Sequence, residues 1–316
     1  MAPELPDHHG LRIARLQAVI SGLTAAAVVA LLVIAVLYGA LWAYAGAALV
    51  VLATPIVMAL EMWLADRVHA DDPAPRPSAV QRARALVGEW GWAWRTFLWN
   101  QPWRSRGHPD SAHPTPRPGV LLVHGYLCNR GFWRPWLRDF ERDGVPFATV
   151  DLEPPFTGID TYAARIEAAR DRLHQLTGHP PLIVAHSMGG LAVRAWLRAQ
   201  GGAHRLPSLA RHVITIGSPH HGTWLARWAH TPNGRQMRRF SEWLTELSRH
   251  EAPEVWAGHL TCVHGHCDNI VFPPATACLP GARVVHVDAQ GHVQMAHAQV
   301  VRSLVQDWLD AEPPRR

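Results

Sequence analysis

The sequence predicts an α/β protein in which about six mostly parallel strands form a sheet with helices on both faces, preceded by a hydrophobic helical hairpin. Two observations support this fold class. From residue 119 onward, short apolar runs alternate with segments whose apolar residues recur at helical spacing, as in parallel sheets with crossover helices. Before that point, the 45 residues 16–60 contain no Asp, Glu, Lys or Arg, a composition that the core helices of soluble proteins do not have.

The apolar run at residues 16–60 is too long for one membrane span. A single helix of this length would extend about 68 Å, roughly twice the hydrocarbon thickness of a bilayer. We therefore expect two spans, residues 16–37 and 41–64, joined by a turn within residues 38–46. The alternatives are one long tilted span or a cleaved signal peptide, although the apolar region of a signal peptide is only about 7–15 residues long.

Arginines flank the predicted hairpin on both sides. Arg12 and Arg15 precede the first span, and further arginines follow the second: Arg67, Arg76, Arg82 and Arg84. The positive-inside rule then places both ends of the hairpin on the cytoplasmic side of the membrane. If only one span crosses, the same Arg12 and Arg15 place the rest of the chain outside.

The chain divides into three predicted regions: a membrane-anchoring helical hairpin at residues 1–66, a Trp-rich helix with a proline-rich linker at 67–118, and the main domain at 119–316. The helix is expected over residues 79–99 and contains four tryptophans: Trp90, Trp92, Trp94 and Trp99. Indole rings favour the membrane interface but also fill protein cores. The sequence leaves both placements open.

Six apolar runs are the strand candidates of the main domain, at residues 120–124, 147–152, 182–185, 212–216, 260–264 and 283–287. Helices are expected at residues 133–142, 162–176, 188–199 and 294–309. The interval at 225–253 is longer than a crossover between strands requires. We therefore expect an inserted helical segment over about residues 225–255.

The segment LIVAHSMGGL at residues 182–191 contains the strongest candidate for catalysis. It predicts a strand, a sharp turn at Ser187 and a helix. A nucleophilic serine requires this context, because small flanking residues let strand and helix approach closely while the hydroxyl projects over the sheet edge. The first small position is Ala185 where glycine is usual, a difference of one methyl group.

Two further segments contribute to the same pattern. The first predicted strand ends in VHGY, and the backbone N–H groups of Tyr126 and Met188 are expected to bind the oxyanion of a tetrahedral intermediate. We expect His124, in that segment, to have a structural role in shaping the turn. The other segment is GSPHHGT at residues 217–223, after the fourth predicted strand.

Taken together, AHSMGG, VHGY and GSPHHGT resemble bacterial lipases and esterases of the α/β-hydrolase superfamily, over about residues 119–309. The resemblance implies the α/β-hydrolase fold, carboxylic-ester substrates, a lid within the inserted segment, and a Ser-Asp/Glu-His triad in that chain order. It implies no cofactor. It does not reach the first hundred residues of the chain.

The acidic member of such a triad is expected to be Asp268, just past the fifth predicted strand. Its role would be to orient and stabilise the histidine without taking its proton. Asp288 is a competing candidate, and Asp151, at the end of an earlier strand, is a weaker one.

The expected base is His292, between the last predicted strand and the final helix, where a loop allows it to reach Ser187. The chain has 21 histidines, so most have other roles. His286 lies within a predicted strand and His297 on a predicted helix, and neither has the same freedom to reach the serine.

The remaining composition excludes several kinds of site. Four cysteines are too few for a disulfide framework, and we expect Cys128, Cys262, Cys267 and Cys278 to be thiols that are mostly buried. No metal site is expected at Cys262, His264, His266 and Cys267, because their spacing matches no common zinc pattern. The net charge of +5 comes entirely from arginine, and no basic, aromatic-rich motif indicates nucleic acid.

The inserted segment combines tryptophan, phenylalanine and leucine with several arginines. One arrangement is a lid whose apolar face covers the site and whose basic face points outward, near a membrane and a lipid substrate. The other is a surface helix pair packed on the sheet. The sequence favours neither.

The sequence therefore predicts a serine hydrolase anchored in the bacterial inner membrane, with its catalytic domain in the cytoplasm, that cleaves lipid or other apolar carboxylic esters through an acyl-enzyme on Ser187. An acyltransferase or thioesterase with the same triad is one alternative. A catalytically silent membrane scaffold protein is another. The natural substrate, acyl chain length and oligomeric state do not follow from the sequence pattern.

Overall fold

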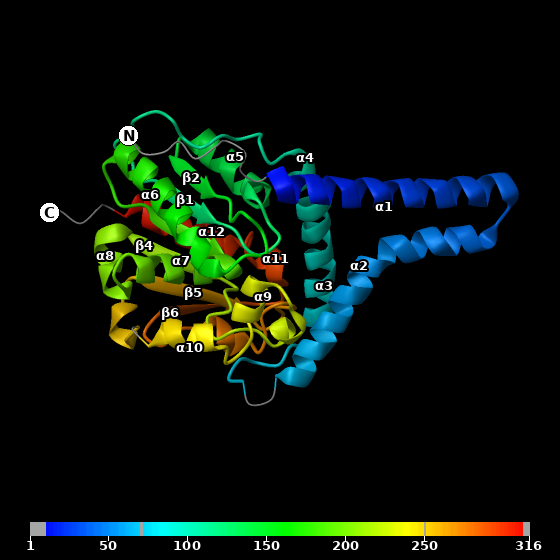
Figure 1. The fold of residues 1–316 in the computed structure, drawn as a ribbon. Coiled ribbons are helices and arrows are strands. Elements are labelled where there is room, and N and C mark those ends of the chain that lie inside the picture. The colour runs from blue at the N-terminus through cyan, green and yellow to red at the C-terminus, as the bar shows by residue number, and fades with distance from the viewer. Residues whose placement is uncertain (1–10, 70–71, 250, 312–316) are drawn as a thin grey trace.

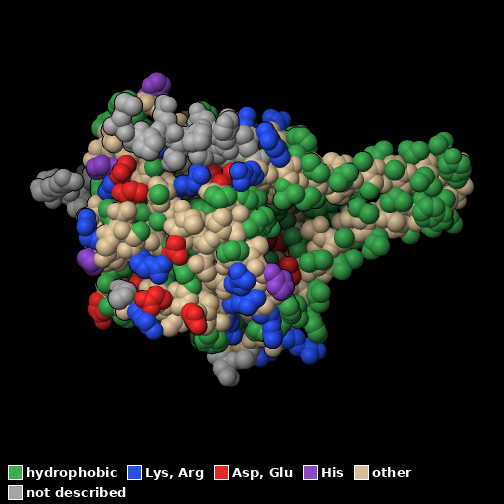
Figure 2. All heavy atoms as spheres, viewed as in Figure 1, with side chains coloured by type: hydrophobic (Ala, Val, Ile, Leu, Met, Phe, Trp, Pro, Cys, Tyr) green, Lys and Arg blue, Asp and Glu red, His purple; other side chains and the backbone are tan. Residues whose placement is uncertain are grey.

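A computed structural model describes residues 11–69, 72–249 and 251–311. It begins with an antiparallel pair of apolar helices, α1 (Leu11–Tyr38) and α2 (Leu41–Val68), which turn at Gly39, where φ is +63°. Figure 1 shows this hairpin projecting from the body of the molecule, and Figure 2 shows hydrophobic side chains covering it. In the most apolar 18-residue stretch of each helix, only 6% of α1 and 17% of α2 is buried, whereas a core helix of a soluble protein is mostly buried. The predicted helical pair is confirmed.

The two halves of α2 have different neighbours. Pro55 lies inside this helix and removes one backbone N–H from its hydrogen-bond pattern. Figure 1 shows α2 changing direction partway along, so that its second half approaches α3 (Ala79–Ala93), which stands between the hairpin and the sheet. Met62 of α2, Ala85 of α3 and Cys267 form a small buried cluster there.

The main domain is built on a six-stranded sheet of order β2-β1-β3-β4-β5-β6, in which every neighbouring pair is parallel. The strands are β1 (Val120–Val123), β2 (Phe147–Val150), β3 (Leu182–His186), β4 (His212–Ile216), β5 (Leu260–Gly265) and β6 (Arg283–Val287). All six predicted strands are confirmed. Alternate residues of each central strand enter two different hydrophobic clusters, because both faces of the sheet are covered.

Helices cover both faces of the sheet. α6 (Ala163–Thr177) and α7 (Met188–Ala199) pack on one face, and α5 (Arg134–Asp143) and α12 (Gln299–Asp310) pack on the other. The helix predicted over residues 294–309 is interrupted: a single turn, α11 (His292–Met295), precedes α12. Short elements complete this part of the chain: η2 (Arg130–Trp133), η3 (Ile159–Tyr162), η4 (Ala203–Arg205), α8 (Leu206–Leu209) and η7 (Pro274–Ala277).

The predicted Trp-rich helix continues beyond α3 through a π-helical turn, η1 (Trp94–Asn100), into α4 (Gln101–Trp103). Its tryptophans divide between the two predicted placements. Trp92 stacks on His297 at a ring distance of 4.1 Å and packs against the core. Trp94 and Trp99 are exposed beside the base of the hairpin, where both line an apolar groove with α1 residues.

The inserted segment contains η5 (Trp224–Trp228), α9 (Pro232–Gln236), α10 (Glu242–Ser248) and η6 (Pro253–Val255). Leu244 and Leu247 of α10 join the core cluster on the α6 and α7 face. Buried Arg194 of α7 forms an ion pair with Glu251, which ties the insertion to the domain. This packing matches the second predicted arrangement, a helix pair packed on the domain.

Candidate active site

Ser187 occupies a strained turn between β3 and α7. Its φ is +56° and its ψ is −130°, values that a residue with a side chain rarely adopts. The glycines after it are required sterically. A Cβ atom on Gly189 would lie 2.6 Å from the Val123 carbonyl oxygen, and one on Gly190 would lie 2.3 Å from Ser218 Oγ. The sequence Ser-Met-Gly-Gly thus lets the turn and α7 pack closely against the neighbouring loops.

The loop after β1 lies directly against this turn. A Cβ atom on Gly125 would lie 2.7 Å from the Cβ of Ser187, so only glycine fits there. Tyr126 follows in the same loop and lines the cavity that contains Ser187. Met188 is the first residue of α7, and its N–H therefore has no acceptor within the helix. These positions are those expected of oxyanion-binding groups.

His124 has the structural role that the sequence predicts. Its Nδ1 lies 3.0 Å from the carbonyl oxygen of Gly125, and its Nε2 lies 3.2 Å from Asp151 Oδ1. Asp151 also accepts a 2.8 Å hydrogen bond from the N–H of Arg130. Asp151 is therefore engaged in holding the loop after β1, and it contacts His124 instead of His292.

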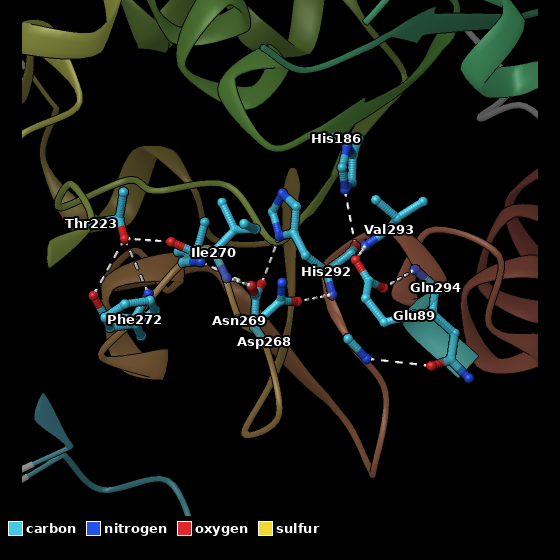
Figure 3. A network of polar contacts seen from close by, with 12 residues as sticks. Glu89, His186, Thr223, Asp268, Asn269, Ile270, Phe272, His292, Val293 and Gln294 are labelled. Carbon is cyan, nitrogen blue, oxygen red and sulfur yellow. Dashed lines mark hydrogen bonds and ion pairs between the residues drawn. The ribbon is translucent and has the colours of Figure 1, made fainter. Parts of the chain in front are cut away.

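Asp268 and His292 are in direct contact, although 24 positions separate them in the sequence. His292 Nδ1 lies 2.9 Å from Asp268 Oδ2, and the two side chains face each other in Figure 3. The other carboxylate oxygen accepts hydrogen bonds of 2.8 Å from the N–H groups of Ile270 and Val271. An ionised carboxylate only accepts, so Nδ1 of the neutral ring has the proton and Nε2 has a free lone pair.

The surroundings of His292 increase its basicity. Burial by itself lowers the pKa of this imidazole, and the Asp268 carboxylate opposes that effect through its charge and its hydrogen bond. The carboxylates of Glu89 and Glu61 act in the same direction, so the pKa of His292 is raised above its ordinary value. An imidazole held in this way is suited to accept a proton from a neighbouring hydroxyl.

The competing candidates lie away from this pair. The Asp288 side chain is largely exposed and binds Gln81 and His266. His286 Nε2 lies 2.7 Å from His266 Nδ1 in a separate histidine pair. His297 is buried between aromatic rings, and burial lowers its pKa to about 3.

Glu89 of α3 is a site residue that the sequence analysis missed. Its two carboxylate oxygens each accept a 2.9 Å hydrogen bond, from the N–H groups of Val293 and Gln294 (Figure 3). These are the two residues directly after His292. Burial raises the pKa of Glu89 to about 7, against the opposite effect of the two backbone hydrogen bonds. Glu89 therefore fixes the backbone from which His292 projects.

Asn269 was also missed, and it links the histidine to the apolar hairpin. Its Oδ1 accepts a 3.2 Å hydrogen bond from the N–H of His292, and its Nδ2 donates a 2.6 Å hydrogen bond to Glu61 Oε2 of α2. On the other side, His186 Nε2 donates a 3.1 Å hydrogen bond to the His292 carbonyl oxygen. Burial lowers the pKa of His186 well below its ordinary range, so that ring stays neutral. The backbone of His292 is thus held on both sides.

The GSPHHGT segment supports the loop that contains Asp268. Gly217 has a φ of +54°, and a Cβ atom there would lie 3.0 Å from Asp268 Oδ2 and 3.1 Å from His292 Nδ1. Thr223 Oγ1 donates a 2.6 Å hydrogen bond to the carbonyl oxygen of Ile270. The glycine therefore makes room for the carboxylate–imidazole pair, and the threonine fixes the chain just after it.

Ser187 and His292 line one cavity of about 670 Å³, within the ~300–1,000 Å³ range typical of ligand sites. The described residues of the inserted segment, 225–249 and 251–255, do not contribute to its lining. The remaining walls come from the end of β3, from the loops after β1 and β5, from α3 and η1, and from α1 and α2. The hairpin is therefore part of this site, which the sequence analysis did not anticipate.

Among residues 11–69, 72–249 and 251–311, no group of three or more His, Cys, Asp or Glu side chains is arranged to hold a metal ion. All four cysteines are free thiols, and three of them are buried.

Comparison with known proteins gives the fold. No protein-family model matches the sequence, and no curated protein matches it. Lipase BlEst2 of Bacillus licheniformis in its mature form is 18% identical, with a TM-score of 0.53 over 64% of this chain and 96% of that chain. Its propeptide form is 17% identical, with a TM-score of 0.53 over 66% and 53% of the two chains. Aspergillus fumigatus lipase B is 19% identical, with a TM-score of 0.48 over 57% and 47%. The parallel six-stranded sheet, with its helices on both faces, thus has the α/β-hydrolase fold of lipases and esterases.

Proposed function

We propose that this chain is a membrane-anchored serine hydrolase that cleaves carboxylic esters through an acyl-enzyme on Ser187. The observation that supports this most strongly is the contact of 2.9 Å between His292 Nδ1 and Asp268 Oδ2, because His292 lines the same cavity as Ser187 on its strained turn. A hydroxyl, an imidazole and a carboxylate in this arrangement have the roles of a nucleophile, a base and an orienting group.

In the first half of the reaction, Ser187 Oγ attacks the ester carbonyl carbon while His292 Nε2 accepts the hydroxyl proton. The carbonyl oxygen becomes an oxyanion, which the N–H groups of Tyr126 and Met188 bind. The C–O bond to the alcohol then breaks, and His292 returns the proton to the leaving oxygen. Asp268 orients the ring and stabilises the imidazolium without taking its proton.

In the second half, a water molecule attacks the acyl-enzyme carbonyl and gives its proton to His292. The bond to Ser187 Oγ breaks, the serine recovers the proton, and the carboxylic acid leaves. The preorganised hydrogen bonds that hold Asp268 and the backbone of His292 reduce the reorganisation required at each step.

Membrane anchoring rests on the hairpin. Both helices are long and apolar enough to span a bilayer, and their apolar windows are mostly exposed. Helix α1 begins and helix α2 ends at the body of the molecule. Arg12 and Arg15 lie at that end of α1, and Arg67 lies at that end of α2. The positive-inside rule therefore places these ends, and the hydrolase domain with them, in the cytoplasm. After alkaline carbonate extraction of membranes, the protein should remain in the pellet; release into the supernatant would contradict anchoring.

The catalytic part of the proposal is tested by hydrolysis of p-nitrophenyl butyrate in mild detergent. Ser187→Ala should lower kcat/KM by about 10³-fold or more, since it removes the nucleophile. Ser208→Ala, an exposed serine on α8, is the matched control and should retain full activity. Full activity of Ser187→Ala would refute the proposal.

A further inference from the structure

We propose that the ester substrate enters from within the bilayer, and that the base of the hairpin binds its acyl chain beside Ser187. This inference rests on the proposed function and specifies its substrate class: an uncharged long-chain acyl ester dissolved in the membrane. The hairpin would then be part of the binding site as well as an anchor.

One face of each apolar helix lines the cavity that contains Ser187. On α1 these residues are Ile13, Leu16, Gln17 and Ile20, and on α2 they include Thr54, Val57 and Met58. Spacings of three and four residues place them along one helical stripe. Figure 2 shows the surface hollowed where the two helices diverge at the base of the hairpin. The hollow adjoins the two helices whose residues line the cavity, and in the proposed arrangement the acyl chain enters there.

The apolar surface continues along the hairpin beyond this cavity. A second groove of about 780 Å³ is lined by the next turns of α1, up to Val29, and shares Trp94 and Leu98 with the first. From Ile13 to Val29, α1 rises about 24 Å. A long acyl chain can thus remain on apolar side chains from the lipid to the nucleophile.

Aromatic residues mark the depth of this opening. Trp99 and Trp103 are each 54% exposed, and both line the second groove together with Trp94. The Arg104 guanidinium lies 5.2 Å from the ring centre of Trp99. Exposed tryptophan and arginine at the base of an apolar hairpin are typical of the membrane–water interface. The second groove, which meets the Ser187 cavity at Trp94 and Leu98, then lies at the level where the ester group of a membrane lipid is found.

The charges in the cavity favour an uncharged headgroup. Its described lining contains no arginine or lysine, and its acidic residues are Glu61 and Glu89. A phosphate held inside this cavity would meet no arginine or lysine in the described lining and would face these carboxylates, and an unpaired charge is costly to bury. Arg95 lines the second groove and lies outside this cavity. The cavity therefore suits an ester whose polar part is neutral.

The test uses the full-length protein in phosphatidylcholine vesicles, with p-nitrophenyl palmitate and p-nitrophenyl butyrate as the two substrates. Val57→Trp on α2 and Ile20→Trp on α1 each fill the cavity from a different helix. Each should lower the palmitate-to-butyrate ratio of kcat/KM about tenfold or more, because the added ring occupies space needed by the long chain. The matched controls, Ile56→Trp and Val19→Trp, lie on exposed positions outside the cavity lining and should leave the ratio unchanged.

Fluorophosphonate labelling of Ser187 in each variant verifies that the site is intact, so a misfolded variant is recognised and the variant on the other helix is used. An unchanged ratio in a labelled cavity variant, or an equal fall in the controls, would overturn the inference while leaving the hydrolase proposal standing. Butyrate hydrolysis that persists at full rate in Ser187→Ala would instead refute the proposed function.

A second arm tests the headgroup charge. Dioleoylglycerol and dioleoylphosphatidylglycerol, with identical acyl chains, are compared in the same vesicles. The uncharged lipid should be hydrolysed at least about tenfold faster, given that the described lining contains no arginine or lysine. Equal or faster hydrolysis of the anionic lipid would overturn the assignment of an uncharged substrate.

Discussion

Glu61, in the second apolar helix, accepts a 2.6 Å hydrogen bond from Asn269, which in turn accepts the N–H of His292. The Asn269 side chain thus links the hairpin to the backbone of the candidate base, His292. The position of α2 and the orientation of the imidazole are therefore coupled by two hydrogen bonds.

Removing the Glu61 acceptor should reduce turnover. Glu61→Leu leaves the Asn269 amide without its partner, so the His292 backbone loses a fixed neighbour. We expect kcat to fall about tenfold to a hundredfold with little change in KM, because small misplacements of a catalytic group have effects of this size. Glu61→Gln retains an acceptor oxygen and should restore most of the activity. Equal losses in both variants would contradict this role.

Asp268→Asn should reduce kcat/KM by about 10³- to 10⁴-fold, since the amide no longer fixes the His292 tautomer. The residual activity should also have a different pH profile. The carboxylate raises the pKa of His292, and the base must be neutral to act. Without the carboxylate, the pKa of His292 falls, and the acidic limb of kcat/KM should move to lower pH. A limb that stays in place or moves to higher pH would show that Asp268 does not act on the base. Asp288→Asn is the control.

Glu89→Gln should also move the acidic limb of kcat/KM to lower pH, by a smaller shift. The Glu89 carboxylate raises the pKa of His292, and its own pKa of about 7 means that it gains charge in the range where the base becomes neutral. Glutamine keeps one acceptor for the backbone after His292 but has no charge. The measurement is a pH profile from 5 to 9, compared with Glu254→Gln at an exposed position. An unshifted profile would limit Glu89 to a structural role.

The ion pair between Arg194 and Glu251 predicts a stability effect. Arg194 also donates hydrogen bonds to Ser248 Oγ at 3.0 Å and to the His220 carbonyl oxygen at 2.9 Å. Arg194→Met leaves a buried carboxylate unpaired, and the free energy of unfolding should fall by about 3–5 kcal/mol. The double variant Arg194→Met/Glu251→Leu should recover much of this loss. Urea unfolding followed by tryptophan fluorescence measures both, and equal losses in the two variants would contradict the argument.

Strands β1 to β5 were predictable from sequence because every residue in them is buried, whereas the edge strand β6 is largely exposed. β1 and β3 appear as uninterrupted apolar runs bounded by glycine and proline. Asp268 and His292 follow the last two strands, and parallel strands place their carboxyl ends at one edge. A local pattern was therefore enough to indicate both residues, and the structure brings them together.

The contributions of Glu89 and Glu61 were not predictable in this way. Glu89 contacts backbone groups 204 and 205 positions away, and Glu61 contacts a side chain 208 positions away. A single carboxylate on a helix has no local pattern that indicates such partners. Likewise, α1 and α2 are apolar on all sides, so periodicity does not show which face lines a cavity. Only the three-dimensional packing reveals these contacts.

The most direct test of the central claim is the covalent intermediate itself. Purified protein is mixed with p-nitrophenyl butyrate at pH 5 to 7, quenched in acid within milliseconds, and analysed by intact mass and peptide mapping. The account predicts a butyryl group on Ser187, formed with a stoichiometric burst of p-nitrophenol, and neither in Ser187→Ala. Ester turnover with no acyl group on this serine, or with the group on another residue, would contradict it.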